Sequence, residues 1–278
     1  GKSLIGYTYS RFIDNSLGNS FILTPQKILQ AQYDDAFGEL GLSTLYGKAN
    51  YTCERRNTNC EIGSVMKQKC PNCPHQKAKT AAISSPNTSL NYKLALLYMS
   101  MDSEQSGFDE RKLMVFDEAH VLEQQLVDFD TIAITKKQCE VLRVDFPSQW
   151  TDITAAQNWI ELKYEPALKT IVDDGRLQAE ELQNEFSLTP DEERFLSDWN
   201  KMNDHLGEIT WLRLQDSSEL EDTRVLVHDI LGVSFKALTA VKAFTDVLRD
   251  KSERMLFMSA TIMDHSGFCK DLGIDPSE

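Results

Sequence analysis

The sequence lacks the features that mark membrane, secreted and fibrous proteins. None of the apolar runs in its 278 residues reaches the roughly 20 residues that a transmembrane helix needs. The first residues contain no basic stretch followed by an apolar one, which a signal peptide would show. Internal repeats and low-complexity tracts are missing, and six cysteines are too few for a disulfide-dense scaffold of this length. These absences predict a globular intracellular protein, cytoplasmic in a bacterium or nuclear in a eukaryote, with no membrane partner.

Charge is plentiful but unevenly distributed. The chain has 43 acidic and 29 basic residues, a net charge of −14, and 41% hydrophobic residues, which is typical of a folded domain. Residues 48–79 carry a local charge of +5, whereas residues 121–230 carry −14. A basic segment can hold a phosphate backbone even in an acidic protein, because charges act over about 8–10 Å. A solvated surface loop is the alternative explanation, and the overall acidity argues against non-specific coating of nucleic acid.

Three short apolar runs predict buried strands that end in polar residues. They cover residues 20–24, 113–116 and 254–258. The first is followed by Pro25, which suits the first turn of a helix that continues to Phe37. Strands that alternate with helices in this way predict an open parallel α/β sheet, and ligands bind such sheets at the carboxyl ends of the strands.

Residues 121–230 differ from this pattern because they are acidic and rich in Glu, Gln, Leu and Trp. We predict a mostly helical insertion there, with helices at 136–143, 154–173, 176–186 and 190–206. Thr189 and Pro190 predict the start of the last of these helices, since Thr is a favoured N-cap and Pro a favoured first residue. The four tryptophans of the chain all fall in this segment and are predicted to form the core of a small helical domain.

The sequence Asp-Glu-Ala-His at 117–120 follows the second predicted strand. An acidic pair at the tip of a buried strand is what phosphoanhydride hydrolysis requires. Asp117 would hold Mg²⁺, directly or through water, and Glu118 would orient and deprotonate the attacking water. An ordinary acidic strand end, followed by a helix, is the alternative explanation of these four residues.

The chain begins Gly1-Lys2-Ser3, which matches the end of a phosphate-binding loop. In such a loop the Lys reaches the β- and γ-phosphates, and the Ser hydroxyl is a ligand of Mg²⁺. Three letters carry little information by themselves. Their value comes from the order of motifs along the chain, because they precede a strand ending at Thr24, the acidic pair, and a strand that leads into Ser259-Ala260-Thr261.

Four of the six cysteines lie close together, at Cys53, Cys60, Cys70 and Cys73. Four thiolates can hold zinc or a [4Fe–4S] cluster, and the spacing does not separate the two. His75 is predicted to be a surface residue, because four cysteines suffice as ligands. The two remaining cysteines, Cys139 and Cys269, are predicted to be ordinary thiols.

Together these motifs resemble those of superfamily 2 helicases. The resemblance rests on Gly1-Lys2-Ser3, the segment from Thr24 to Gln32, the residues 117–120, and Ser259-Ala260-Thr261. The segment Gly47-Lys48-Ala49-Asn50-Tyr51-Thr52-Cys53, followed by three more cysteines, is similar to the run that introduces the cluster in iron–sulfur helicases of the XPD/DinG group. The similarity covers essentially the whole chain and favours [4Fe–4S] over zinc.

The resemblance implies an α/β fold: a RecA-like parallel-sheet motor domain with a small four-cysteine iron–sulfur insertion and a mostly helical arch insertion. The motor domain would comprise three pieces separated by the two insertions. The expected boundaries are 1–47 for its first part, 48–79 for the cluster insertion, 80–120 for its second part, 121–230 for the arch and 231–278 for its third part. A second RecA-like domain is not expected in these residues, so we expect them alone to be inactive as a motor.

The resemblance also implies the activity, which is ATP-dependent 5′→3′ translocation on single-stranded DNA and unwinding of forked duplex DNA. ATP and Mg²⁺ would be bound by Gly1, Lys2, Ser3 and Asp117, and catalysis would use Asp117, Glu118 and His120. His120 would couple hydrolysis to Ser259 and Thr261. Contacts with DNA are expected from Lys48, Arg55, Arg56, Lys67, Lys69, Thr24 and Asn87.

Two alternatives remain open from the residues. One is a DNA-stimulated ATPase that does not unwind duplexes. The other is a zinc-stabilised nucleic-acid-binding module without catalysis.

Overall fold

The computed structural model describes residues 1–13, 19–54, 58–66, 70, 72–185, 187–261 and 264–277. The chain forms two compact units. We call Gly1–Thr52, Asn72–Phe129 and Thr239–Glu278 the sheet unit, and Cys53–Pro71 with Asp130–Leu238 the helical unit. Each unit is formed by segments that are far apart in the sequence.

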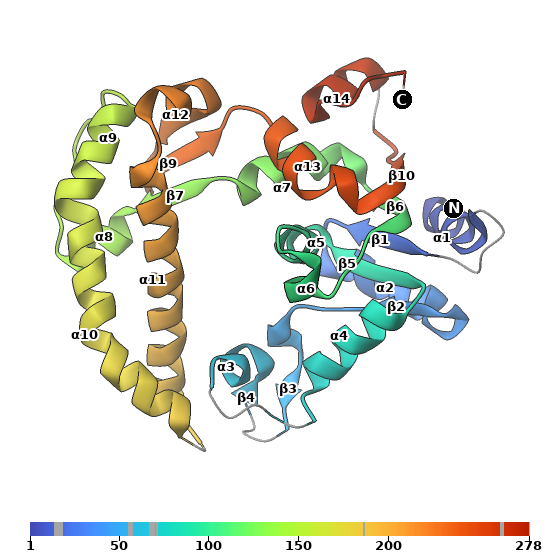
Figure 1. Ribbon diagram of the computed structural model, residues 1–278, viewed down its shortest axis with the longest axis horizontal. Helices are drawn as coiled ribbons and strands as arrows, with labels where there is room; N and C mark the ends of the chain where they lie inside the picture. The colour runs from blue at the N-terminus through green and yellow to red at the C-terminus, as the bar shows by residue number, and fades with distance from the viewer. Residues whose placement is uncertain are drawn as a thin grey trace. The chain divides into compact units, whose positions relative to one another are not determined.

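The sheet unit is built on five parallel strands (Figure 1). Their order across the sheet is β10 (Ser252–Met258), β6 (Arg111–Asp117), β1 (Ser20–Thr24), β5 (Asn87–Asn91) and β2 (Leu42–Thr44). The three apolar runs of the sequence are all strands of this sheet. The prediction of a parallel α/β sheet is therefore confirmed.

Alternating side chains of the central strands form two separate cores. Phe21, Leu23 and Phe116 belong to one core, whereas Ile22 and Val115 belong to the other, as the two-residue repeat of a strand requires. Helices α1 (Lys2–Phe12) and α2 (Lys27–Phe37) contribute to the second core. The first core lies under the helices α4 (Pro74–Ser84), α5 (Tyr92–Met99), α7 (Leu122–Phe129), α13 (Val241–Val247) and α14 (His265–Leu272).

Helix α1 lies unusually close to the sheet because Gly6 faces it. A Cβ atom at Gly6 would be 2.6 Å from Cε of Met258 and 3.2 Å from a methyl group of Val115, so a larger residue would require the Met258 side chain to move. The close approach sets the position of Lys2 at the beginning of α1 relative to the sheet.

Helix α2 begins two residues later than predicted. Gln26 is its N-cap in an extended conformation and Lys27 its first residue, so Pro25 precedes the helix instead of occupying its first turn. The short helix α6 (Ser103–Ser106) follows α5 and ends at Gly107, whose φ of 77° is left-handed.

The helical unit contains two long helices, α10 (Glu165–Asn184) and α11 (Pro190–Leu214), which lie side by side (Figure 1). Thr189 and Glu192 form a capping box at the start of α11, which confirms the predicted helix start. The predicted interruption between residues 173 and 176 is wrong, since α10 continues through it. Gly175 allows the two helices to meet closely, because a Cβ there would lie 2.7 Å from Cδ1 of Trp199.

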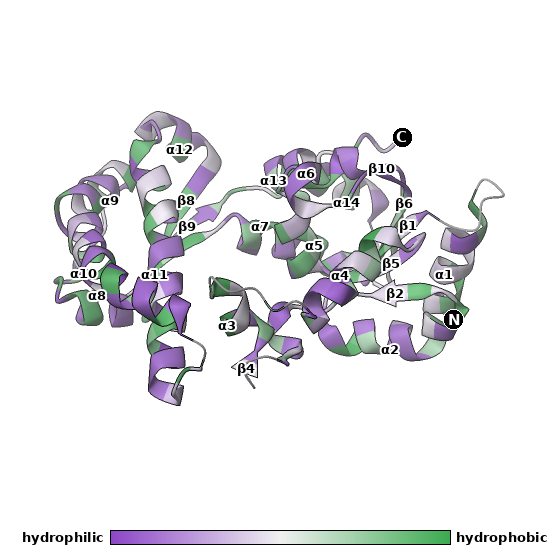
Figure 2. Ribbon diagram, turned by 60° about the horizontal axis from the view of Figure 1, so that its bottom comes forward, coloured by the Kyte–Doolittle hydropathy of each residue, from purple (hydrophilic) through white to green (hydrophobic). Residues whose placement is uncertain are grey.

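The remaining elements of the helical unit surround this pair. They are β3 (Thr52–Cys53), β4 (Thr58–Asn59), α3 (Cys60–Val65), β7 (Ile132–Thr135), α8 (Lys136–Leu142), α9 (Ile153–Trp159), a π-helical turn (Ile160–Tyr164), α12 (Ser217–Thr223), β8 (Arg224–His228) and β9 (Gly232–Ala237). Figure 2 shows hydrophilic and hydrophobic residues alternating along α10 and α11, as expected of amphipathic helices.

The helical unit also contains a three-stranded antiparallel sheet in the order β7-β9-β8, which was not predicted from the sequence. β9 pairs with β7 and lies beyond residue 230, the predicted end of the insertion. The predicted tryptophan core is largely confirmed, since Trp150, Trp159 and Trp199 pack against the apolar core of this unit. Trp211 is exposed and lies beneath the guanidinium of Arg224.

Candidate functional site

The parallel sheet brings the predicted motifs of the chain to one edge. Asp117 is the last residue of β6 and is paired with Met258 of β10, so Ser259 follows directly beside it. Thr24 is the last residue of β1, the next strand. This edge contains the carboxyl ends of the strands, where parallel sheets bind ligands.

The residue that follows Asp117 has a strained backbone. Glu118 has a φ of 52°, in the left-handed region, which is uncommon for a residue with a side chain. Its backbone N–H donates to Oδ1 of Asp117 over 3.0 Å. Backbone strain of this kind is concentrated at functional sites, where the surrounding structure holds the residue in place.

Five of the predicted motif residues form a continuous polar chain at this edge. The ammonium of Lys2 donates to one carboxylate oxygen of Glu118 over 2.5 Å. Nδ1 of His120 lies 3.4 Å from the other oxygen of Glu118 and 2.8 Å from Oγ of Ser259. Thr261 completes the chain, because its backbone N–H donates to Ser259 Oγ over 3.1 Å. Residues separated by more than 250 positions are thus joined through hydrogen bonds and an ion pair.

Asp117 accepts a hydrogen bond from a tyrosine that was not among the predicted site residues. The hydroxyl of Tyr92, at the start of α5, donates to the backbone carbonyl of Asp117 over 2.7 Å. The carboxylate of Asp117 is nearly buried, at 3% exposure for the whole residue. Burial and the charge of Asp117 hold the pKa of Tyr92 well above its usual value, so its hydroxyl stays protonated and donates. The apolar spacing of α5 gave no sign of this polar contact.

The side chains at this edge suit a magnesium–phosphate ligand. A carboxylate from Asp117 and a hydroxyl from Ser3 are oxygen donors of the type that Mg²⁺ prefers, and Lys2 supplies a positive charge for phosphate oxygens. Ser3 and Asp117 both lie close to the buried hydroxyl of Tyr33 on α2, although neither forms a hydrogen bond of normal geometry with it.

The four clustered cysteines lie in both units. Cys53 and Cys60 are buried in the helical unit. Gly63 packs against Cys53, since a Cβ atom added at Gly63 would lie 3.0 Å from Sγ of Cys53. Cys70 is half-exposed in the same unit, and Cys73 is the N-cap of α4 in the sheet unit. All six cysteines carry thiols rather than disulfides. In the part of the chain that the structure describes, no three His, Cys, Asp or Glu side chains are arranged to hold a metal ion, so the iron–sulfur cluster remains a prediction.

His75 is buried, at 5% exposure, and the prediction of a surface residue is wrong. Its ring packs edge-on against Tyr51 at 5.4 Å, and Nε2 lies 3.5 Å from the hydroxyl of Tyr98. Burial lowers the pKa of His75, as do the nearby charges of Lys48 and Lys79. The neutral ring therefore belongs to the core that supports α4.

The predicted DNA-contacting residues lie in different environments. Lys48 is exposed, whereas the side chain of Thr24 is buried and donates to the Gln26 carbonyl. Asn87 is fully buried at the amino end of β5, where Ser20 Oγ donates to its Oδ1 over 2.9 Å. A fully buried amide cannot touch DNA in this conformation; Asn91, at the carboxyl end of the same strand, is the asparagine on the motif side. Arg55, Arg56, Lys67 and Lys69 lie outside the described residues.

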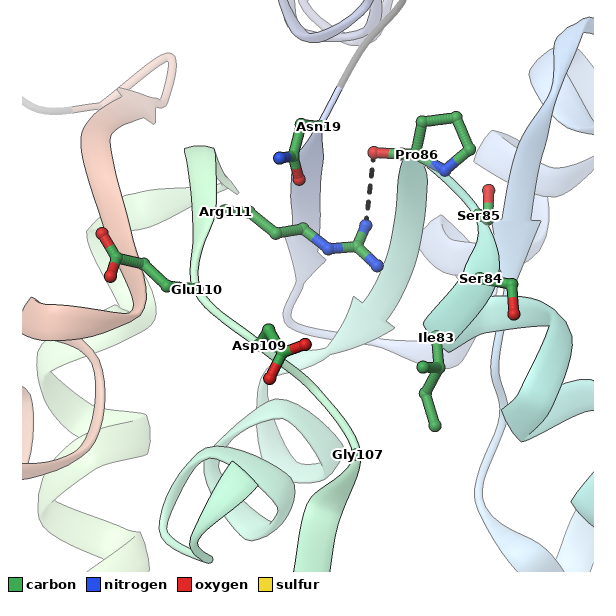
Figure 3. Close-up of a pocket in the computed structure, with 9 residues that line it drawn as sticks. All are labelled: Asn19, Ile83, Ser84, Ser85, Pro86, Gly107, Asp109, Glu110 and Arg111. Carbon is green, nitrogen blue, oxygen red and sulfur yellow. Dashed lines mark hydrogen bonds between the residues drawn. The ribbon is translucent and has the colours of Figure 1, made fainter. Parts of the chain in front are cut away.

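A separate pocket of about 440 Å³ lies at the opposite edge of the sheet (Figure 3). Arg111 lines it, and its guanidinium donates to the carbonyls of Ser20, Pro86 and Ala82, as Figure 3 shows for Pro86. Burial lowers the pKa of Arg111 to about 10, which still leaves it charged. Because its donors are engaged by backbone carbonyls, Arg111 joins the amino ends of three strands and is not aimed at a ligand.

No family model and no curated protein matches the sequence. Solved structures do match, among them two XPD structures. One, named truncated XPD, has a TM-score of 0.52 at 13% identity, over 99% of this chain and 90% of that one. The other, named XPD helicase, has a TM-score of 0.53 at 14% identity, over 99% of this chain and 55% of that one.

The fold is similar to that of these two XPD structures. The likeness extends over both units, and the chain spans about half the length of the second XPD structure. At 13–14% identity the XPD-like relationship rests on the fold, so the activity has to be argued from the residues of this chain. No helix in the described ranges is both long enough and apolar enough to span a membrane.

Proposed function

We propose that this chain contains the first motor domain of an ATP-dependent DNA helicase of the XPD type, which moves 5′→3′ on single-stranded DNA and unwinds forked duplexes. The observation that carries the proposal is the polar chain from Lys2 through Glu118 and His120 to Ser259. It joins a phosphate-binding residue, a general base and the residues after β10 in one network.

The residues of this network would have distinct roles in hydrolysis. Lys2 would exchange its ion pair with Glu118 for the β- and γ-phosphates, which releases the Glu118 carboxylate to accept a proton from the attacking water. Ser3 and Asp117 would hold Mg²⁺, which neutralises developing charge on the phosphates. His120 contacts both Glu118 and Ser259, so it would transmit the change at Glu118 to the strand that ends beside it.

The iron–sulfur cluster is the second part of the proposal. Cys53, Cys60, Cys70 and Cys73 would be its ligands, and a bound cluster would supply metal–thiolate bonds that stabilise a segment too small to fold by its own core. The described part of this segment packs by a small apolar contact, in which Met66 meets Ala179 and Leu196 of the long helices. Lys48, Arg55, Arg56, Lys67 and Lys69 would contact DNA phosphates around it.

Replacement of Lys2 by alanine tests the motor directly. In the full-length protein, Lys2→Ala is expected to abolish strand displacement and to weaken nucleotide binding by at least about tenfold, since an ammonium–phosphate contact is worth about 1.5–3 kcal/mol. The matched control is Lys169→Ala, which removes an exposed lysine of α10 in the helical unit. Normal unwinding by the Lys2 variant would contradict the proposal.

The acidic surface of the helical unit is expected to limit DNA affinity. Asp174, Glu180 and Glu181 are exposed on α10 and can be reversed together to lysine. Because each phosphate contact releases counterions, the triple variant should bind single-stranded DNA more tightly at low salt, with a steeper dependence of affinity on salt. Binding isotherms at several salt concentrations measure both quantities; an unchanged affinity and slope would remove the repulsion hypothesis.

A further inference from the structure

Tyr33 differs from the other buried tyrosines of this protein. Its side chain is 1% exposed, and its ring packs against Phe37 with centroids 5.7 Å apart. Its hydroxyl is buried and has no hydrogen-bond partner among the residues that the structure describes. Buried polar groups in native proteins are nearly always hydrogen-bonded, so an exception requires an explanation.

The other buried tyrosines show that this is not a general property of buried hydroxyls in this protein. The hydroxyl of Tyr7, in the same apolar cluster, donates to the carbonyl of Leu40 over 2.7 Å. Tyr92 donates to Asp117, and the hydroxyls of Tyr98 and Tyr164 lie within 3.5 Å of histidine nitrogens. Only the Tyr33 hydroxyl, among these five, lacks a partner within the described ranges.

The surroundings of the Tyr33 hydroxyl indicate what would supply its partner. Ser3 and Asp117 are the side chains within hydrogen-bonding reach of it, although neither forms a bond of normal geometry with it. The charges of Asp117 and Glu118 also act on it. A tyrosine hydroxyl is both a hydrogen-bond donor and an acceptor. It can donate one hydrogen bond and accept another between the two residues assigned to Mg²⁺.

We propose that Tyr33 is a positioning residue for the Mg²⁺ ion of the bound nucleotide, with its hydroxyl hydrogen-bonded to a water molecule of the ion's hydration shell. Mg²⁺ in nucleotide sites keeps several waters, and groups that hold such waters or ligands contribute strongly to metal affinity. The proposal rests on the nucleotide site proposed above and assigns it a residue from α2, outside every motif used to locate it.

The Tyr33→Phe variant tests this assignment, since it removes the hydroxyl and keeps the buried ring. In the full-length protein, Mg²⁺ is titrated against binding of a fluorescent ADP analogue, and the apparent affinity for Mg²⁺ is expected to fall about tenfold. Without nucleotide and metal, the variant should resist urea at least as well as the wild type, because the hydroxyl it loses makes no hydrogen bond there. Tyr7→Phe is the matched control, which should unfold more easily and keep its Mg²⁺ affinity.

The possible outcomes separate this inference from the function on which it rests. If the wild-type protein binds no Mg²⁺ and nucleotide, the proposed function fails. If the wild type binds both and Tyr33→Phe has the same Mg²⁺ midpoint, only the role of Tyr33 is overturned. Loss of urea resistance in Tyr33→Phe equal to that of Tyr7→Phe would likewise overturn it, because the hydroxyl would then have a structural partner.

Discussion

Replacing Glu118 by glutamine is expected to lower DNA-stimulated ATP hydrolysis in the full-length protein by about 10²–10⁴-fold, the range that a general base contributes. Glutamine keeps the shape of the side chain but cannot accept the proton of the attacking water. The substitution also removes the ion pair between Glu118 and Lys2, so Lys2 can bind the phosphates without first breaking that ion pair. Nucleotide binding should therefore be retained or become tighter while turnover is lost.

The control for this experiment is Glu123→Gln, which changes an exposed glutamate in the first turn of α7. Its steady-state turnover should equal that of the wild type. Single-turnover measurements distinguish slow chemistry from slow product release. If Glu118→Gln hydrolyses ATP within about tenfold of the wild-type rate, the general base is another group and the assignment of roles in the polar chain has to be abandoned.

Serine substitution of the clustered cysteines is expected to have the second-largest effect. The wild-type protein, purified without oxygen, should be brown and absorb broadly in the visible region. Cys60→Ser should lose most of its iron and colour and become easier to cleave by protease within residues 53–73, since metal–thiolate bonds supply on the order of 10 kcal/mol of folding free energy. Iron analysis, absorption spectra and limited proteolysis measure these changes.

Cys139→Ala provides the matched control for these variants. Cys139 is buried in the core of the helical unit, and burial raises the pKa of its thiol to about 11, which disfavours the thiolate form that a metal needs. This variant should keep its colour and iron. A colourless wild-type protein with one bound zinc would instead support the zinc-stabilised binding module, and full iron content in Cys60→Ser would exclude that cysteine as a ligand.

The sheet and its functional edge were predictable because both depend on local patterns. The runs at 20–24 and 113–116 are buried on both faces, as strands between two layers of helices require. The run at 254–258 forms the edge strand β10, which is only partly buried, so the prediction of a buried strand was wrong there. Each run ends in polar residues, and parallel strands bring those ends to one edge. The predicted start of α11 was equally local, because the N-cap of a helix depends on a few adjacent residues.

Other features depended on contacts between distant segments. Asn87 lies in a polar segment that is typical of an exposed turn, yet it begins a strand and is buried against Ser20. His75 looked like a surface residue beside two cysteines, yet it packs against Tyr51 and Tyr98. A break in a helix was predicted between residues 173 and 176, yet Gly175 lies within α10 and permits the contact with Trp199. In each case the deciding neighbour lies more than 20 positions away.

The same distinction applies to the nucleotide site. The amino-acid types of Lys2, Asp117 and Glu118, and the strand that presents the acidic pair, follow from the sequence, because chemistry and local periodicity are properties of short segments. The left-handed backbone at Glu118, the polar chain to Ser259 and the unpartnered hydroxyl of Tyr33 exist only in the folded chain. They arise where α1, α2, β6 and β10 converge, and hydrogen-bond geometry between such elements is set by packing rather than by the order of residues.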